Sequence, residues 1–217
     1  MSKGKLITFE GPEKSGKSTQ AKLLSEYLKV KGYKTICVRE PGSTQIGEKI
    51  RHILLDKRHT GMSVMTEMLL YMAARAQLVE QIIRPALYRG YIVLCDRFLD
   101  STIAYQGFGC GMNRDMIRKI GHYVTGGIRP DLTLLLNFWE SSAHLKNHKS
   151  PDRIEMRSNG FHRRVKRGYF LLAKKEPQRI KMIKVHRDLD KTQGQIREIV
   201  DQCLLKKSSA KTVRSHC

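Results

Sequence analysis

The sequence predicts a single α/β domain in which helices cover both faces of a five-stranded parallel sheet. Apolar runs rich in β-branched residues alternate with amphipathic stretches along the chain. Within each run the apolar residues are nearly continuous, as is typical of parallel strands that are covered on both faces. The expected strands are residues 6–9, 35–38, 91–95, 132–136 and 180–185. Strands and helices that follow one another in this way predict a three-layer, doubly wound fold.

A helix over residues 18–31 is expected to join the first two strands. Ala21, Leu24 and Leu28 recur at helical spacing and would form one apolar face. Gly32 follows as a natural C-terminal cap. This part of the chain therefore predicts a β-α-β unit.

A longer helical stretch is expected from about residue 64 to residue 87. It should be interrupted at Arg84-Pro85, because proline removes a helix hydrogen bond and disfavours helix in the residue before it. No internal repeat or low-complexity linker divides the chain, so one domain is expected over residues 1–205. Residues 206–217 contain four bases, no acid and little apolar content, which predicts a mobile basic tail.

Composition argues against several classes of protein. With 40% hydrophobic and 28% charged residues the chain should be globular, and no apolar stretch approaches the ~20 residues that a membrane span needs. The N-terminus has no apolar region and cleavage site typical of a secretory signal, so a cytoplasmic protein is expected. The five cysteines are odd in number and include no Cys-x-x-Cys pair, which predicts reduced thiols and no zinc site.

The net charge of +21 is unevenly distributed along the chain. Residues 144–187 contain 14 Lys or Arg against three acidic residues, and so carry +11 of the total. Such a field attracts polyanions, whether nucleic acid, a membrane surface or nucleotide phosphates. A solvated basic face without a partner is the alternative.

A phosphate-binding loop is predicted between the first strand and the first helix. The sequence GPEKSGKS fits the pattern G-x-x-x-x-G-K-[ST] in the setting that the pattern requires. Its backbone amides would turn toward phosphate oxygens, Lys17 would reach the β and γ phosphates, and the Ser18 hydroxyl would ligate Mg²⁺. A chance turn beside a lysine is the alternative, and the flanking strand and helix argue against it. The predicted ATP-binding residues are Gly11, Pro12, Glu13, Lys14, Ser15, Gly16, Lys17, Ser18 and Thr19.

The strand over residues 91–95 runs directly into Asp96-Arg97. A carboxylate at the carboxyl end of a parallel strand lies in the ligand crevice, where Asp96 could hold Mg²⁺ through water. An N-cap for the next helix is the alternative role for Asp96. Together with the loop, this feature indicates ATP or GTP with magnesium and leaves the acceptor unspecified.

Four arginines could form a second anionic site that faces the first. Arg39, Arg51, Arg75 and Arg97 follow apolar strands or lie on predicted helices near them. Arginine binds phosphate through two parallel hydrogen bonds, which suits an acceptor phosphate. A surface salt bridge is the alternative for each of them.

Several motifs make the chain resemble the bacterial thymidylate kinase family along nearly its whole length. In order they are FEGPEKSGKST, REPGST, AARAQLVEQIIRPAL, DRFLDSTIAYQG, PDLTLLLN and DRIE. The resemblance implies a P-loop NTPase of the nucleoside monophosphate kinase type. Its reaction would be phosphoryl transfer from ATP to dTMP, giving dTDP and ADP for dTTP and DNA precursor synthesis. It also implies Mg²⁺ as cofactor and a homodimer formed through helices.

The resemblance also implies roles around the acceptor phosphate and sugar. Glu13 would lie near the 3′ hydroxyl of the sugar, and Tyr105 would lie beside the sugar. Arg51 and Arg97 would grip the phosphate of the nucleoside monophosphate. For Tyr105, packing in the core is the alternative.

The remaining implied roles concern the acceptor base. Arg75 would face the edge of thymine, helped by Ser101, Thr102 and Gln106, and Tyr71 would stack on the ring. An arginine and an amide can read the donor and acceptor edge of a pyrimidine, and an aromatic ring supplies a stacking face. For Tyr71 too, core packing is the alternative.

Phosphoryl transfer between two nucleotides depends mainly on where the cations lie. The acceptor phosphate oxygen is already an anion, so no general base is required. One positioned cation can be worth ~10³ in rate, or roughly 4 kcal/mol of barrier. We therefore expect Lys17, Arg97, Lys14 and Asp96 to be the catalytic residues.

Lys14 departs from the usual bacterial pattern, which has glycine at this position of the loop. The lid, expected around residues 143–155, is also shorter than in many bacterial members. We predict that Lys14 supplies charge stabilisation that a longer lid would give; a solvated lysine is the alternative. The charged lid residues are Lys146, Lys149, Arg153 and Glu155.

Two questions stay open at the level of the sequence. His186 stands where the family tends to have aspartate, so no adenine contacts are assigned there. A kinase for another monophosphate such as dUMP is an alternative, because one methyl group leaves no spacing signature. A nucleic-acid-binding P-loop protein is a third possibility, although no RNA- or DNA-binding motif is present.

Overall fold

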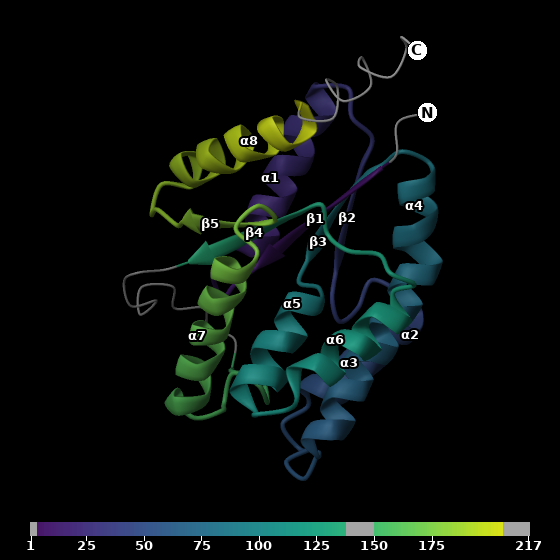
Figure 1. Ribbon diagram of the computed structural model, residues 1–217, viewed down its shortest axis with the longest axis vertical. Helices are drawn as coiled ribbons and strands as arrows, with labels where there is room; N and C mark the ends of the chain where they lie inside the picture. The colour runs from purple at the N-terminus through teal and green to yellow at the C-terminus, as the bar shows by residue number, and fades with distance from the viewer. Residues whose placement is uncertain (1–3, 138–149, 206–217) are drawn as a thin grey trace.

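The computed structural model describes residues 4–137 and 150–205, and it confirms the predicted α/β fold (Figure 1). Five parallel strands form one sheet in the order β2-β3-β1-β4-β5. The predicted lid up to residue 149, with Lys146 and Lys149, and the predicted tail over residues 206–217 lie outside the described residues. The strands are β1 (Lys5–Glu10), β2 (Thr35–Arg39), β3 (Ile92–Asp96), β4 (Leu132–Asn137) and β5 (Ile180–Lys184).

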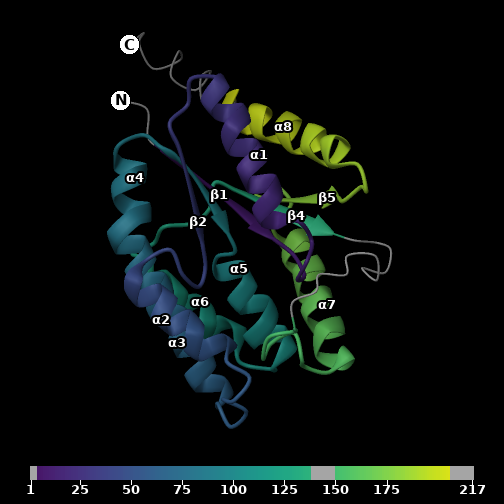
Figure 2. The ribbon, with the colours of Figure 1, turned by 180° about the vertical axis from the view of Figure 1, so that it is seen from behind.

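Helices cover both faces of the sheet, which gives the three layers that the sequence predicts. Helices α1 and α8 lie together on one side, and α3 to α7 lie on the other (Figures 1 and 2). Within the described ranges, no helix has the length and hydropathy of a transmembrane segment. The helices are α1 (Lys17–Val30), α2 (Gln45–Leu55), α3 (Val64–Leu78), α4 (Arg84–Tyr88), α5 (Leu99–Thr102), α6 (Arg114–Val124), α7 (Asn159–Lys175) and α8 (Leu189–Leu205).

The apolar core divides along the two faces of the sheet. On one face, strand residues such as Ile7 and Phe9 pack against Leu24 and Leu28 of α1 and the apolar side of α8. On the other face, Leu6 packs with residues of α3 and α4. Neighbouring residues of β1 therefore point to opposite, fully buried faces, which explains why its apolar run is continuous.

The strand order places the predicted phosphate loop next to the end of β3. β1 is the central strand, and its residue Phe9 is in register with Asp96 of β3. The backbone N–H of Arg97 then donates to the carbonyl oxygen of Phe9 at 2.9 Å. Because both strands are parallel, the loop after β1 and the turn after β3 leave the sheet side by side.

The long helical stretch departs from the prediction in how it is interrupted. Instead of ending at Arg84-Pro85, α3 passes through a π-helical turn, η1 (Val79–Ile83), into α4. Pro85 lies in the first turn of α4, where its missing N–H costs little. A second π-helical stretch, η2 (Ile103–Gly109), follows α5. Such turns occur often at functional sites, and η2 carries part of the predicted acceptor motif.

Candidate active site

The loop after β1 has the backbone geometry of a phosphate cradle. Gly11 has a φ of 134°, and a Cβ there would lie 2.3 Å from the carbonyl oxygen of Leu136. Gly16 caps α1 in the left-handed region, with a φ of 82°. Both positions therefore require glycine, the first for space and the second for its dihedral angle. The amides at the start of α1 are left free to receive an anion.

Lys17 folds back over this loop. Its Nζ donates to the carbonyl oxygen of Pro12 at 2.8 Å and lies within 3.4 Å of that of Gly11 and 3.3 Å of Ser15 Oγ. Burial, and after it the positive charge of Arg97, lowers the pKa of Lys17 to about 8. The ammonium group is thus held at the centre of the loop, next to the site that the sequence predicts for the β and γ phosphates.

Ser18 and Asp96 meet at the edge of the sheet. The Ser18 hydroxyl donates directly to Asp96 Oδ2. A hydroxyl and a carboxylate are oxygen ligands, which suit Mg²⁺ when phosphate and water complete its shell. In residues 4–137 and 150–205, no group of three or more His, Cys, Asp or Glu could hold a metal by itself. The pair therefore fits a magnesium ion that is shared with nucleotide phosphates.

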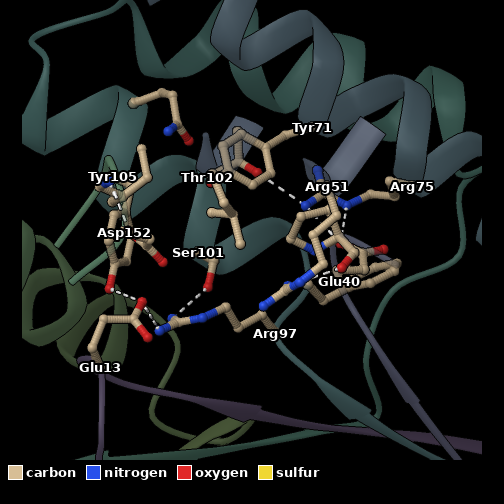
Figure 3. Close-up of a pocket in the computed structure, with 15 residues that line it drawn as sticks. Glu13, Glu40, Arg51, Tyr71, Arg75, Arg97, Ser101, Thr102, Tyr105 and Asp152 are labelled. Carbon is tan, nitrogen blue, oxygen red and sulfur yellow. Dashed lines mark hydrogen bonds and ion pairs between the residues drawn. The ribbon is translucent and has the colours of Figure 1, made fainter. Parts of the chain in front are cut away.

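One pocket opens beside the phosphate loop and encloses about 540 Å³, its open mouth included (Figure 3). Every side chain that the sequence predicts for the acceptor lines it: Glu13, Arg51, Tyr71, Arg75, Arg97, Ser101, Thr102, Tyr105 and Gln106. No individual role was predicted for the other residues of the lining, which are Glu40, Pro41, Leu55, Phe98, Asp152 and Ile154.

Arg97 crosses the pocket on the side of the phosphate loop. Its Nη2 lies 2.5 Å from Glu13 Oε1, and its Nη1 donates to Gly11 O at 2.9 Å and to Ser101 Oγ at 3.2 Å (Figure 3). Tyr105 also donates to Glu13 Oε1, at 3.2 Å. Burial opposes ionisation of Glu13, but the nearby guanidinium of Arg97 lowers its pKa. A cation thus lies directly between the donor loop and the acceptor pocket.

Glu10 holds the turn that carries Arg97, a role that was not predicted from the sequence. Its side chain is fully buried and accepts from the N–H of Phe98 at 2.8 Å and from Ser101 Oγ at 2.5 Å. The Tyr169 hydroxyl donates to it as well, at 3.0 Å. Burial, followed by the negative charge of Asp100, raises the pKa of Glu10 to about 7. This carboxyl group fixes the start of α5 against the end of β1.

Arg75 lies at the other end of the pocket and is almost completely buried. Its Nε donates to Glu40 Oε2 at 2.8 Å, and its Nη2 donates to Thr102 Oγ1 at 2.9 Å (Figure 3). Nη1 lies 3.2 Å from the sulfur of Met72. Burial raises the pKa of Glu40 to about 7 despite its ion pair with Arg75. Arg75 is therefore rigidly placed, as a group that reads a ligand must be.

The four candidate arginines divide into two groups. Arg51, Arg75 and Arg97 line the pocket, and Arg51 Nη1 donates to the carbonyl oxygen of Pro41 at 3.0 Å. Arg39 points elsewhere: it is exposed and makes a salt bridge with Glu48 at 2.8 Å. For Arg39 the surface salt bridge is thus the correct interpretation.

The two tyrosines also differ from each other. Tyr105 belongs to the core as well as to the pocket, with its ring 6.0 Å from Phe161 and 6.3 Å from Tyr169, both edge to face. Tyr71 is half-buried and presents its ring at the pocket wall opposite Arg97 (Figure 3). The alternative of core packing therefore holds in part for Tyr105, whose ring packs in the core and also lines the pocket.

The family model for thymidylate kinase matches residues 9–196. The chain belongs to the thymidylate kinase family. The thymidylate kinase of Exiguobacterium sp. is 49% identical over 195 residues, which cover 89% of this chain and 92% of the relative. That of Roseiflexus castenholzii is 44% identical and covers 91% of this chain and 93% of its own. The crystal structure of thymidylate kinase from Ehrlichia chaffeensis superposes with a TM-score of 0.76 at 32% identity, covering 92% of this chain and 99% of that one.

Lys14 has a backbone conformation that is unusual for a residue with a side chain. Its φ of 59° lies in the left-handed region, which favours glycine. Its Nζ lies 3.9 Å from Glu155 Oε2, and 38% of the side chain is exposed. The lysine is therefore tied loosely to the end of the predicted lid.

Arg153 departs from the prediction that it is a lid cation. Its Nη2 lies 2.6 Å from Glu67 Oε2, and its Nε donates to the carbonyl oxygen of Leu54 at 2.8 Å. The side chain is buried between α2 and α3 because it satisfies a buried carboxylate there. Arg153 thus anchors the end of the predicted lid to α2 and α3, and its guanidinium is not directed at the phosphate loop.

Proposed function

We propose that the protein transfers the γ-phosphoryl group of ATP to dTMP, giving dTDP and ADP for dTTP synthesis in the cytoplasm. Membership of the thymidylate kinase family supports this proposal. The observation that carries it is the pocket beside the phosphate loop, where Arg51 and Arg97 lie together with Arg75 and Gln106. This arrangement suits a ligand with a phosphate at one end and a base at the other.

The chain contributes position and charge, and no general base is needed, because the attacking phosphate oxygen is already an anion. Lys17 and the amides of the loop hold the donor phosphates. Arg97 binds the acceptor phosphate next to them, since it already bridges the loop and the pocket. Glu13 then exchanges its contact with Arg97 for one with the sugar hydroxyl. Holding two polyanions in line in this way supplies most of the rate acceleration.

Mg²⁺ is the proposed cofactor, and Ser18 and Asp96 are the residues that would hold it. When bound, the ion neutralises charge on the β- and γ-phosphate oxygens. The direct contact between the hydroxyl and the carboxylate supports this role, because it brings two oxygen ligands to one point next to the loop. Asp96 as an N-cap is the alternative; α5 receives no side-chain cap from its N-cap residue, Phe98.

A homodimer through α2 and α3 is part of the proposal. These two helices pack against each other and still expose large apolar side chains toward solvent. The exposed fractions are 52% for Ile46, 43% for Ile53, 45% for Met65 and 48% for Leu69. Sedimentation equilibrium of the wild-type protein and of Leu69→Glu tests this idea: the wild type should be dimeric and the variant monomeric.

A coupled assay of ADP release with ATP and Mg²⁺ tests the function. We expect kcat/KM for dTMP to exceed that for dUMP, CMP and GMP. A higher value for any of the others would support the alternative of a different monophosphate kinase. If no substrate releases ADP and the protein binds polynucleotide with steep salt dependence, the kinase proposal is wrong.

A further inference from the structure

Glu67 of α3 is a buried carboxylate to which no role in substrate binding has been assigned above. None of it is exposed, and both of its oxygens accept hydrogen bonds. Oε2 accepts from Arg153 Nη2 at 2.6 Å and from Arg157 Nη2 at 2.7 Å. Oε1 accepts from Gln106 Nε2 at 2.8 Å. One carboxylate therefore joins two arginines, one at the end of the predicted lid and one just beyond it, to a side chain of the acceptor pocket.

The contact with Glu67 decides which way the Gln106 amide faces. A carboxylate that accepts through both oxygens has nothing to donate, so only the NH₂ end of an amide can face it. Gln106 is almost completely buried, which leaves its side chain little freedom to turn over. Its carbonyl oxygen, Oε1, is then the end that is left for the pocket that Gln106 lines. Glu67 thus makes Gln106 an acceptor toward a ligand.

Arg75 provides the complementary group in the same pocket. Its guanidinium has five N–H donors. Nε donates to Glu40, Nη2 contacts both Glu40 and Thr102, and Nη1 contacts the sulfur of Met72, which leaves one N–H of Nη1 for a ligand. The pocket therefore offers a ligand at least one donor from Arg75 and one acceptor from Gln106. A pyrimidine with a 4-oxo group presents O4 as an acceptor beside N3–H as a donor, which matches this pair. A 4-amino pyrimidine presents the reverse pattern.

We propose that Glu67 is the positioning residue that makes the acceptor site select 4-oxo pyrimidine nucleotides over cytosine nucleotides, by fixing the orientation of the Gln106 amide. The inference rests on the proposed function, in that it takes the occupant of the pocket to be a pyrimidine monophosphate. A buried site that forms specific hydrogen bonds rejects a ligand with the wrong pattern strongly, because its polar groups are left unpaired.

The substitution Glu67→Gln tests the proposal directly. The new amide can face Gln106 with either end, so Gln106 is free to turn its NH₂ group into the pocket. We expect the ratio of kcat/KM for dTMP to kcat/KM for dCMP to fall by about tenfold or more, partly through a gain with dCMP. In a Gln106→Leu background, adding Glu67→Gln should not change the ratio further, because there is no amide left to orient.

Arg157→Met is the matched control. It removes one partner of Glu67 and leaves the bond between Glu67 and Gln106, so it should lower the melting temperature and keep the ratio of dTMP to dCMP. Equal losses of the ratio in Glu67→Gln and Arg157→Met would mean that Glu67 acts only through stability, and would overturn the proposal. A folded Glu67→Gln protein that keeps the wild-type ratio of kcat/KM for dTMP to kcat/KM for dCMP would also overturn the proposal.

A measurement on the wild-type protein covers the case in which Glu67→Gln does not fold. The side-chain ¹⁵N–¹H signals of Gln106, assigned by their loss in Gln106→Leu, should exchange slowly and move little when dTMP binds. A large shift would place the NH₂ group against the base and overturn the proposal. Wild-type protein that phosphorylates neither dTMP nor dCMP would contradict the proposed function itself, whereas a preference for dTMP that ignores Glu67 contradicts only this inference.

Discussion

The donor side and the acceptor side of this site are built in different ways. The donor side is almost one continuous segment, residues 11–19, whose shape follows from two glycines and the start of α1. The acceptor side collects single side chains from α2, α3, α5, η2 and the loops after β1 and β3, held by buried partners such as Glu10, Glu40 and Glu67. Changes to the donor side should therefore act on the chemical step, and changes to the acceptor side on substrate binding and selection.

The largest effect that this comparison predicts is at Lys17. The variant Lys17→Met should lower kcat by about 10³ or more, because it removes the cation nearest to the transferred group. KM for dTMP should change by less than about threefold, since Lys17 belongs to the donor side. Steady-state kinetics with each substrate varied in turn measures both constants. Lys22→Met, on the exposed face of α1, is the control and should behave like the wild type.

A large effect on the acceptor side is expected from Arg97→Lys. Lysine keeps the charge but cannot bridge Gly11, Glu13 and Ser101 with one planar group. We expect kcat/KM for dTMP to fall by about 10², with much of the loss in KM. Arg39→Lys is the matched control, because Arg39 is exposed and outside the pocket. If the two variants lose the same activity, Arg97 has no special contact with the acceptor.

How much could be predicted from the sequence follows the same division. The strands and the loop over residues 11–18 are local features, since a continuous apolar run and fixed glycine spacing encode them directly. Residue type alone suggests an anionic site for the acceptor arginines, but the individual roles of the acceptor residues follow only from resemblance to a family, because nothing in their spacing shows that α2, α3 and η2 converge. Arg39 shows the limit: its residue type fits a phosphate site, but its side chain pairs with Glu48 outside the pocket.

The three buried glutamates were beyond the reach of the sequence for a physical reason. Glu10, Glu40 and Glu67 act through hydrogen bonds to residues 35 to 159 positions away, so no local pattern contains both partners. The buried ion pair of Arg153 is hidden from the sequence for the same reason, because its partner Glu67 lies 86 residues earlier. A glutamate inside a mainly apolar stretch is the one sequence feature that indicates such a contact, since a buried carboxylate without a partner would be costly. Tertiary contacts alone reveal which partner it has.

Substitution of Lys14 tests whether the donor loop carries a second catalytic cation besides Lys17. We expect Lys14→Gly to lower kcat by about tenfold, because it removes a positive charge beside the transferred group. The backbone at Lys14 is in a region that glycine tolerates better, so the melting temperature should not fall. Lys14→Gln keeps a side chain at this left-handed position but removes its positive charge, and should show the same loss of kcat. A loss under about threefold in turnover, close to 0.7 kcal/mol, would contradict a catalytic role.

The smallest effect that we predict is a change in how stability depends on pH, through Glu40 on the acceptor side. Burial raises the folded-state pKa of Glu40 to about 7 from an ordinary value of 4.5, so between these two pH values the folded state binds more protons than the unfolded state. The free energy of unfolding therefore decreases as pH rises through this interval and levels off above pH 7. Glu40→Gln should remove up to about 1.4 kcal/mol per pH unit from this slope. Urea unfolding at several pH values measures it. Glu48→Gln is the control: burial opposes ionisation of Glu48, but hydrogen bonds from Ser43 and Arg39 outweigh burial and lower its pKa, so Glu48 does not titrate in this interval. An unchanged slope would mean that Glu40 stays ionised throughout, and that Arg75 holds it more strongly than burial opposes it.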